Sequence, residues 1–337
     1  MAKKTLAVSY RPTTFSEVCG QESTKIILQQ QLDSGDVRNA YAFIGASGCG
    51  KTTCARIFAN EINHGQGVPI EMDAASHSSV EDVREIIKMA QTKSLDSEYK
   101  IFIVDEAHSI STQGWQAFLK TIEEPPAKSI FIFCTTNPEK MPKTIMNRVQ
   151  QYRFKRISQK DIEERLEYVL KEEGIKKYDA DAISFLTRQS RGGMRDALAL
   201  LDKCLGYSEE VTLDNVLKAL ELSDTDTFLD LTDAVLDKDT KTIIEIIEDV
   251  YAGGEDMKQF IKQYMNFVLD VSKYLVCSDF KYTQLPETGE MKDWLRGFKS
   301  DDLDTILDLL DKIIAIDADI KFSSSAKEYI EVQLITF

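Results

Sequence analysis

The sequence has no apolar run long enough to cross a membrane. Its longest apolar stretches, such as AFIGA and SIFIFC, cover only a handful of residues, whereas a spanning helix needs about 20. The N-terminus MAKKTLAVSYRP is basic, but no sustained apolar region accompanies it, which disfavours a secretory signal. These absences predict a cytoplasmic protein with no membrane partner.

Cysteine and histidine are few and scattered. The six cysteines include no C-x-x-C pair and the three histidines no H-x-x-x-H pair, which disfavours a disulfide framework and a structural zinc site. We therefore expect isolated thiols and imidazoles in a reducing compartment, and no zinc. These residues are Cys19, Cys49, Cys54, Cys134, Cys204, Cys277, His64, His77 and His108.

Basic charge is also in deficit, since the net charge is −15. Such a balance disfavours a surface coated with DNA-binding side chains, although a local basic patch on an acidic body stays compatible with it. With 337 residues and 43% hydrophobic content, the chain can bury a large core and divide into two or three domains.

The first part of the chain alternates apolar runs with helical stretches. Three of the runs are nearly continuous in apolar residues, which is typical of strands buried on both faces of a parallel sheet. The alternation predicts a three-layer α/β domain over residues 1–156. Its expected strands are 40–45, 68–74, 100–107, 129–136 and 149–154, and its expected helices include 51–62, 79–92 and 112–123.

Beyond Ser158 the pattern is helical. A first helix follows a serine cap and carries an apolar stripe at Ile162, Leu166 and Leu170. With helices at 179–190 and 194–206, it predicts a small three-helix domain over 157–207. The stretch 206–212 reads as a linker, and 208–337 as a further all-helical domain.

The segment GASGCGKT, Gly45 to Thr52, fits the pattern G-x-x-x-x-G-K-[ST] between an expected strand and an expected helix. Gly45, Gly48 and Gly50 allow successive backbone N–H groups to converge on phosphate, Lys51 reaches the β- and γ-phosphates, and Thr52 ligates magnesium. We include Ser47, Cys49 and Thr53 of the same segment in the predicted nucleotide site.

The segment IFIVDEAH supplies acidic partners at the end of a buried strand. Asp105 can hold magnesium through a water, and Glu106 can orient and deprotonate an attacking water. The letters DEAH also occur in helicases, but these need a second α/β domain, and the chain reads as helical after residue 155. We therefore expect a magnesium-dependent ATPase.

Several stretches together resemble AAA+ clamp-loader ATPases, most closely the gamma/tau subunits of bacterial DNA polymerase III and more distantly the small subunits of replication factor C. They are SYRPTTFSEVCGQE, DAASHSSVEDVREI, IVDEAHSIS, FLKTIEEPP, TTNPEKMP and RGGMRDALALLD, and the dense resemblance covers roughly residues 6–205. It implies a pentameric ATPase, with a helical lid and collar, that opens a sliding clamp and places it on primer-template DNA. Hydrolysis would trigger release, and the partners would be other clamp-loader subunits, the clamp and DNA.

The resemblance also assigns residues to the nucleotide site. Tyr10, Arg11 and Pro12 would line the pocket, with Val18 and Gly20 near the adenine. Thr136 would sense the γ-phosphate, with Asn137 as a second candidate. Arg195, at the start of a lid helix after Gly192 and Gly193, would fold onto the γ-phosphate of the same subunit.

Arg148 lies in KTIMNRVQQYRF, without an acidic residue in the ten positions after it. The family usually reads Ser-Arg-Cys here, and the resemblance implies that the arginine acts in trans, in the ATP site of a neighbouring subunit. This chain has Asn147 and Val149 as flanking residues, which keeps the charge and changes the seating of the loop.

Two departures from the family stand out. The four-cysteine zinc module is absent, since NHGQGVPIEM fills its place, and we expect no polymerase-binding tail after the helical region. A short, zinc-free version suits a phage or another divergent replication system.

Contacts with DNA or the clamp are predicted around the helix 79–92, where Ser78 and Glu81 fit a capping box. Helix N-termini bind phosphate through backbone N–H groups, and the apolar stripe reads equally well as core. The candidates are Ser78, Ser79, Arg84, Ile87 and Lys88.

Two alternatives stay open. One is another AAA+ DNA-remodelling ATPase of the branch-migration type, which an acidic, all-helical C-terminal region disfavours. The other is a structural clamp-loader subunit with weak ATPase, which the retained Lys51 and Glu106 disfavour.

Overall fold

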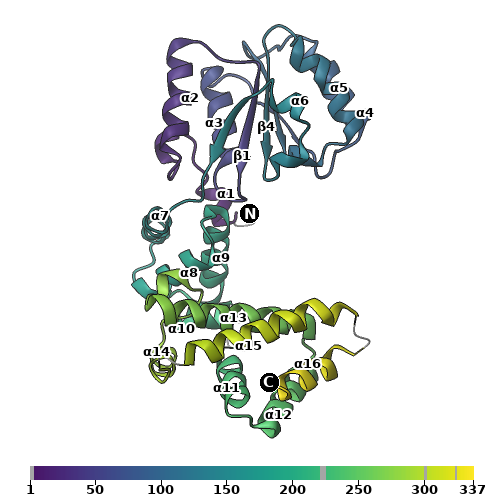
Figure 1. The fold of residues 1–337 in the computed structure, drawn as a ribbon. Coiled ribbons are helices and arrows are strands. Elements are labelled where there is room, and N and C mark those ends of the chain that lie inside the picture. Colours follow the sequence, from purple (N-terminus) through teal and green to yellow (C-terminus); the bar gives the residue numbers. More distant parts are fainter. Residues whose placement is uncertain (1–3, 221–224, 300–301, 323–324) are drawn as a thin grey trace. The chain divides into compact units, whose positions relative to one another are not determined.

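The computed structural model describes residues 4–220, 225–299, 302–322 and 325–337 (Figure 1). Its contacts group into two units, each treated by itself below. The first unit is Met1–Glu172 with Ser190–Asp202, and the second is Glu173–Gln189 with Lys203–Phe337. Within the described residues, no helix is both long and apolar enough to span a bilayer.

The first unit is built on a five-stranded parallel sheet in the order β2-β3-β4-β1-β5. The predicted α/β fold and all five predicted strands are confirmed, with ends shifted by up to two residues. The strands are β1 (Ala40–Gly45), β2 (Ile70–Asp73), β3 (Lys100–Asp105), β4 (Ser129–Thr135) and β5 (Gln150–Phe154).

Helices cover both faces of the sheet, because successive strand residues point to opposite faces. Tyr41 and Phe43 of β1 pack into the core on the side of α2 and α3, whereas Ala40, Ala42 and Ile44 pack on the side of α4, α5 and α6 (Figure 1). Helices α3 and α5 have the predicted bounds. The helices of these two layers are α2 (Glu22–Ser34), α3 (Lys51–Ile62), α4 (Val80–Ala90), α5 (Thr112–Glu123) and α6 (Lys143–Met146).

Aromatic rings fill one of these layers. Phe102 stacks on Phe131 with ring centroids 5.1 Å apart, and Phe118 meets Phe133 edge-on at 5.4 Å. All four side chains are fully buried, and such pairs stabilise the core beyond the area they bury. This packing fixes the ends of β3 and β4, where the polar residues of the site begin.

The remaining elements of the first unit are short or belong to the predicted lid. They are α1 (Leu6–Ser9), η1 (Phe15–Glu17), η2 (Ala107–Ser109), η3 (Pro138–Lys140), α7 (Gln159–Glu172) and the first part of α9 (Met194–Tyr207). Helix α9 continues through Tyr207, two residues into the predicted linker, and Val211 then bridges to Tyr178.

In its described residues the second unit is built from helices, and the Tyr178–Val211 bridge is its one strand-like pairing. The buried Arg188 of α8 donates to Glu287 Oε1 at 3.1 Å and to the Leu285 carbonyl at 3.0 Å, which ties α8 to the loop before α14. Its elements are α8 (Ala180–Gln189), α10 (Leu213–Ala219), α11 (Thr225–Leu236), α12 (Thr240–Ala252), α13 (Met257–Cys277), η4 (Phe280–Tyr282), α14 (Gly289–Arg296), α15 (Asp302–Asp319), η5 (Ile320–Phe322) and α16 (Ala326–Ile335).

The start of α4 corrects one prediction. The capping box joins Ser79 to Asp82, not Ser78 to Glu81: the Ser79 hydroxyl accepts from Asp82 N, and the Asp82 carboxylate accepts from Ser79 N at 3.1 Å. Val80 is the first helical residue, so the preceding Ser79, with extended backbone, is the N-cap.

Candidate nucleotide-binding site

The site lies where β1, β3 and β4 end, because parallel strands bring their carboxyl ends to one edge of the sheet. The loop 45–50 connects β1 to α3 at this edge, and backbone N–H groups at such a helix N-terminus can bind phosphate. Gly48 has a φ of +71°, and a Cβ there would lie 3.0 Å from Gly193 Cα. Both features favour glycine at this position, and they let the segment before α9 pack directly on the loop.

Lys51 is the first residue of α3, and its side chain folds back over the loop. Its Nζ donates to the Gly45 and Ala46 carbonyls at 2.9 and 2.8 Å, and the residue is only 7% exposed. A buried ammonium needs such partners. The two carbonyls hold the Lys51 ammonium beside the loop, where phosphate oxygens would replace them as its hydrogen-bond acceptors.

Thr52 and Asp105 are joined directly, as Thr52 Oγ1 donates to Asp105 Oδ2 at 2.7 Å. A hydroxyl and a carboxylate beside a phosphate-binding loop form an oxygen-donor set that suits magnesium. These residues therefore fit the ion that a nucleoside triphosphate brings, as the sequence predicts.

Glu106 follows β3 with a φ of +46°, which turns its side chain away from the strand direction. Its Oε2 lies 3.4 Å from Thr136 Oγ1 and 3.3 Å from His108 Nδ1. The latter nitrogen is also 3.2 Å from Thr135 Oγ1. The predicted base and the predicted γ-phosphate sensor are thus brought together at the ends of β3 and β4.

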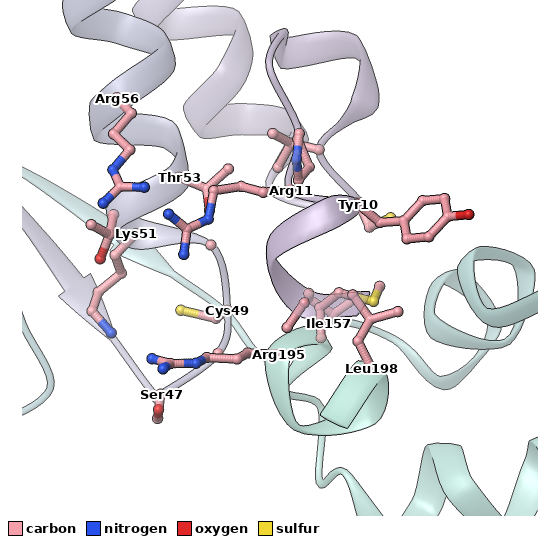
Figure 2. A pocket seen from close by; sticks show the side chains of 18 of the residues that line it. Tyr10, Arg11, Ser47, Cys49, Lys51, Thr53, Arg56, Ile157, Arg195 and Leu198 are labelled. Atoms are coloured by element: carbon pink, nitrogen blue, oxygen red, sulfur yellow. The ribbon is translucent and has the colours of Figure 1, made fainter. Parts of the chain in front are cut away.

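The lid segment reaches the loop through α9. Met194 N donates to the Gly48 carbonyl at 3.0 Å, which fixes the first turn of the helix beside the loop. Figure 2 shows Arg195 extending from this helix toward the side of the loop that carries Ser47 and Cys49. The predicted contribution of Arg195 to the pocket is compatible with this placement.

The N-terminal segment lies along another side of the phosphate-binding loop. Figure 2 shows Arg11 reaching toward Thr53 of α3, while the Tyr10 ring points away from the loop. That ring meets Tyr168 of α7 edge-on at 6.4 Å, and Arg165 Nη2 donates to the Tyr10 carbonyl at 2.9 Å.

Together these elements enclose a pocket of about 310 Å³, within the range of small-molecule sites. Of the predicted nucleotide residues, Gly20, Gly45, Thr136 and Asn137 do not line it. Those that do are Tyr10, Arg11, Pro12, Val18, Ser47, Gly48, Cys49, Gly50, Lys51, Thr52, Thr53, Asp105, Glu106 and Arg195.

Sequence reasoning missed several lining residues. Arg56 follows Thr52 by one helical turn, so helix periodicity could have identified it. Arg165 of α7 belongs to none of the motif stretches, whereas Leu198 of α9 lies in the quoted stretch RGGMRDALALLD and could have been included from it. The missed residues are Ala7, Cys19, Arg56, Ile157, Arg165, Met194 and Leu198.

Three family models match consecutive parts of the chain. They are described as DNA polymerase III, delta subunit (residues 63–158), DNA polymerase III clamp loader subunit, ATPase lid domain (161–210), and DNA polymerase III subunits gamma and tau domain III (211–336). The chain belongs to the gamma/tau-like clamp-loader family of AAA+ proteins.

Individual relatives agree with this assignment. The DNA polymerase III subunit gamma/tau of Mycobacterium tuberculosis is 37% identical over 276 residues, which cover 74% of this chain and 48% of the relative. The DNA polymerase III subunit tau of Escherichia coli is 31% identical over 290 residues, covering 80% and 45%. The chain thus spans about half the length of the curated relatives it matches.

Solved structures support the fold. The Holliday junction branch migration motor RuvB of Thermotoga maritima superposes with a TM-score of 0.52 at 20% identity, covering 72% of this chain and 80% of RuvB. At this identity the similarity concerns the fold alone.

In this gamma/tau-like chain, Arg148 lies outside the pocket, just after α6. Its Nη2 forms an ion pair with Glu123 Oε1 at 2.7 Å, and its Nη1 donates to the Thr144 carbonyl at 2.7 Å. The sequence neighbourhood was therefore misleading, because the carboxylate comes from the end of α5. The role in trans stays a prediction.

The candidate DNA and clamp residues lie on or just before α4. Ser79 is engaged in the capping box, Arg84 Nη1 is 3.9 Å from Glu81 Oε1, and Ile87 packs against the core. The first turn carries Glu81 and Asp82, whose charges disfavour a phosphate at this helix N-terminus. The DNA role of Ser78, Ser79, Arg84, Ile87 and Lys88 stays a prediction.

Cys49 of the loop, Cys54 of α3 and Cys134 of β4 are buried in the same core cluster. Burial raises the pKa of the Cys49 thiol, raises that of Cys54 to about 12 and holds that of Cys134 well above its usual range. They are therefore protonated and unreactive at neutral pH. All six cysteines of the chain are free in the described structure.

Proposed function

We propose that this chain is the ATPase motor subunit of a sliding-clamp loader, which opens a processivity clamp and loads it on primer-template DNA. The observation that carries the proposal is the joint placement of Lys51, Thr52, Asp105, Glu106 and Arg195 around one pocket, in a chain of the gamma/tau-like family.

The cations of the pocket suit a triphosphate. Lys51 would move from the Gly45 and Ala46 carbonyls to phosphate oxygens, exchanging neutral acceptors for charged ones, which strengthens its hydrogen bonds. Arg11 and Arg195 approach from opposite sides of the loop (Figure 2). Their guanidinium groups would add charge where the transferred phosphoryl group develops it.

Thr52 and Asp105 would hold the magnesium ion, which neutralises charge on the β- and γ-phosphates. Glu106 would leave its contacts with Thr136 and His108 to orient and deprotonate the attacking water. Thr136, freed by that movement, would face the γ-phosphate as its sensor.

Assembly completes the proposal. Arg148 would act in the ATP site of the next subunit of a pentamer, so that hydrolysis depends on neighbouring subunits. The partners would be further clamp-loader subunits, the sliding clamp and primed DNA, with hydrolysis triggering release.

A steady-state ATPase assay under four conditions tests the proposal. The chain is first assembled with its companion subunits. ATPase activity of this complex is then measured without addition, with the sliding clamp of its source, with a primed single-stranded template, and with both. We expect the largest stimulation with both, together with clamp retained on circular primed DNA after gel filtration. Stimulation by a four-way junction, with no response to clamp and primed DNA, would instead favour a branch-migration motor.

A further inference from the structure

The pair Glu123–Arg148 is a contact that the nucleotide site does not use. It lies in an open surface groove of about 500 Å³ beside the first residues of β1 and β5, whereas the phosphate-binding loop follows the last residue of β1. The second arginine of this groove, Arg38, has its own carboxylate at Asp36, 3.1 Å away. Glu123 is thus matched to Arg148 and not to the nearby cation.

The position of Glu123 is electrostatically unusual. It is the last residue of α5, and Glu124 is the C-cap. The C-terminal end of a helix carries partial negative charge, so acidic side chains are disfavoured there. Arg148 offsets this cost for Glu123.

The Arg148 guanidinium makes two contacts within the chain and is otherwise partly exposed to solvent. One nitrogen caps α6 at the Thr144 carbonyl and another meets Glu123, whereas an arginine carries five N–H donors. The side chain stays 39% exposed. Two contacts therefore fix a long, flexible side chain while donors remain for a phosphate group outside the chain.

We propose that Glu123 is a positioning residue for Arg148: it holds the guanidinium in the orientation in which it enters the neighbouring subunit's ATP site. This inference rests on the proposed function, in which Arg148 acts in trans. Ordering the side chain before assembly reduces the conformational entropy lost when the finger meets the phosphate. Removing the Glu123 carboxylate keeps the charge of Arg148 but allows its side chain to adopt more conformations.

A double-mutant cycle in the assembled complex tests the proposal. ATPase turnover at saturating ATP, with clamp and primed DNA, is measured for the wild type, Glu123→Ala, Arg148→Ala and the double variant. We expect Glu123→Ala to lower kcat by about two- to five-fold, the range of a partly exposed ion pair. In the Arg148→Ala background the same change should have no effect.

Two further variants separate positioning from general structure. Glu123→Gln keeps an oxygen acceptor and should restore part of the lost turnover. Glu124→Ala removes the adjacent carboxylate, for which the described residues include no ion pair, and should leave turnover unchanged. Thermal unfolding and ATP affinity of each variant should match the wild type, since Glu123 lies outside the nucleotide pocket.

The outcomes distinguish this inference from the function it rests on. Unchanged turnover for Arg148→Ala would overturn the role of Arg148 in trans. If Arg148→Ala causes a large loss of turnover, the role of Arg148 stands and the Glu123→Ala result decides the role of Glu123. That role is overturned if Glu123→Ala leaves turnover unchanged, raises it, or lowers it equally in both backgrounds.

Discussion

Thr52 Oγ1 donates a hydrogen bond to Asp105 Oδ2 at 2.7 Å, although the two residues lie 53 positions apart in the chain and on different secondary-structure elements. Thr52 is in the first turn of α3 and Asp105 is the last residue of β3. Since β1 and β3 both end at the same edge of the parallel sheet, the fold alone brings them together. The fold therefore places together the two oxygen donors that we propose for magnesium.

Thr52→Val keeps the side-chain shape and removes the hydroxyl. We expect ATP binding in EDTA to stay near wild type, while the gain in affinity on adding Mg²⁺ is largely lost, because one oxygen donor is missing. Titration of a fluorescent ATP analogue with and without Mg²⁺ measures this gain. Thr52→Ser keeps the oxygen and should retain the gain, and an intact gain in the valine variant would contradict the assignment.

Lys51→Ala should weaken ATP binding by about 1.5–3 kcal/mol, roughly 10- to 150-fold, because a charge-assisted contact to phosphate disappears. Isothermal calorimetry on the folded variant measures the affinity. Lys51→Arg keeps the charge with a different shape, so its ATP affinity should lie between those of the wild type and Lys51→Ala. Near-normal affinity in Lys51→Ala would remove this lysine from the nucleotide site.

Local sequence patterns predicted the elements and missed some of the contacts between them. The continuous apolar runs identified β1, β3 and β4, and the glycine-rich motif identified Lys51 and Thr52, since each signal lies within a few residues. Contacts made by distant segments left no such signal. Glu123 meets Arg148 only because α5 packs near α6, and Arg165 reaches the Tyr10 carbonyl only because the chain folds α7 beside its N-terminus.

Glu106→Gln should separate nucleotide binding from hydrolysis. The amide cannot deprotonate water, so single-turnover hydrolysis should fall by a factor on the order of 10²–10⁴, the usual range for a lost general base. ATP affinity should stay close to wild type, because the carboxylate faces Thr136 and His108. Wild-type hydrolysis by the variant would assign the base elsewhere.

Asp233 predicts a pH-dependent stability of the helical second unit. Burial, together with Asp237 and Asp230, raises the pKa of its carboxyl against the opposing hydrogen bond from Trp294 Nε1. The unfolded chain then ionises first as the pH rises, so the folded state loses stability between the unfolded pKa near 4 and the raised folded pKa. Asp233→Asn, which can still accept from Trp294, should raise Tm at pH 7.

The gain from Asp233→Asn should shrink as the pH is lowered through and below the unfolded pKa near 4, where the carboxyl becomes protonated in both states. Thermal unfolding followed by circular dichroism at several pH values measures it. Asp308→Asn removes an equal charge from an exposed position, and it corrects for the general relief of a net charge of −15. A gain that is the same at every pH, or equal in both variants, would contradict the expected burial effect.

Arg148→Ala should leave the chain folded and able to bind ATP, because Arg148 lies outside the lining of its own nucleotide pocket. Turnover of the assembled complex should nevertheless fall by about 10³–10⁵, the contribution of an arginine finger in related phosphoryl transfers. Loss of the Glu123 ion pair costs little stability, since both side chains are about 40% exposed. Calorimetric ATP binding and complex ATPase therefore separate the two roles.

Mixing variants decides whether Arg148 acts in trans. Neither Arg148→Ala nor Lys51→Ala chains can form a complete site alone. In a mixed complex, a Lys51→Ala subunit can donate its intact Arg148 to the intact pocket of an Arg148→Ala subunit, so part of the ATPase activity should return. Native mass spectrometry establishes co-assembly at each mixing ratio. If co-assembled complexes stay inactive at every ratio, Arg148 serves its own chain through Glu123 and Thr144, and the neighbouring site must draw its cation from another residue.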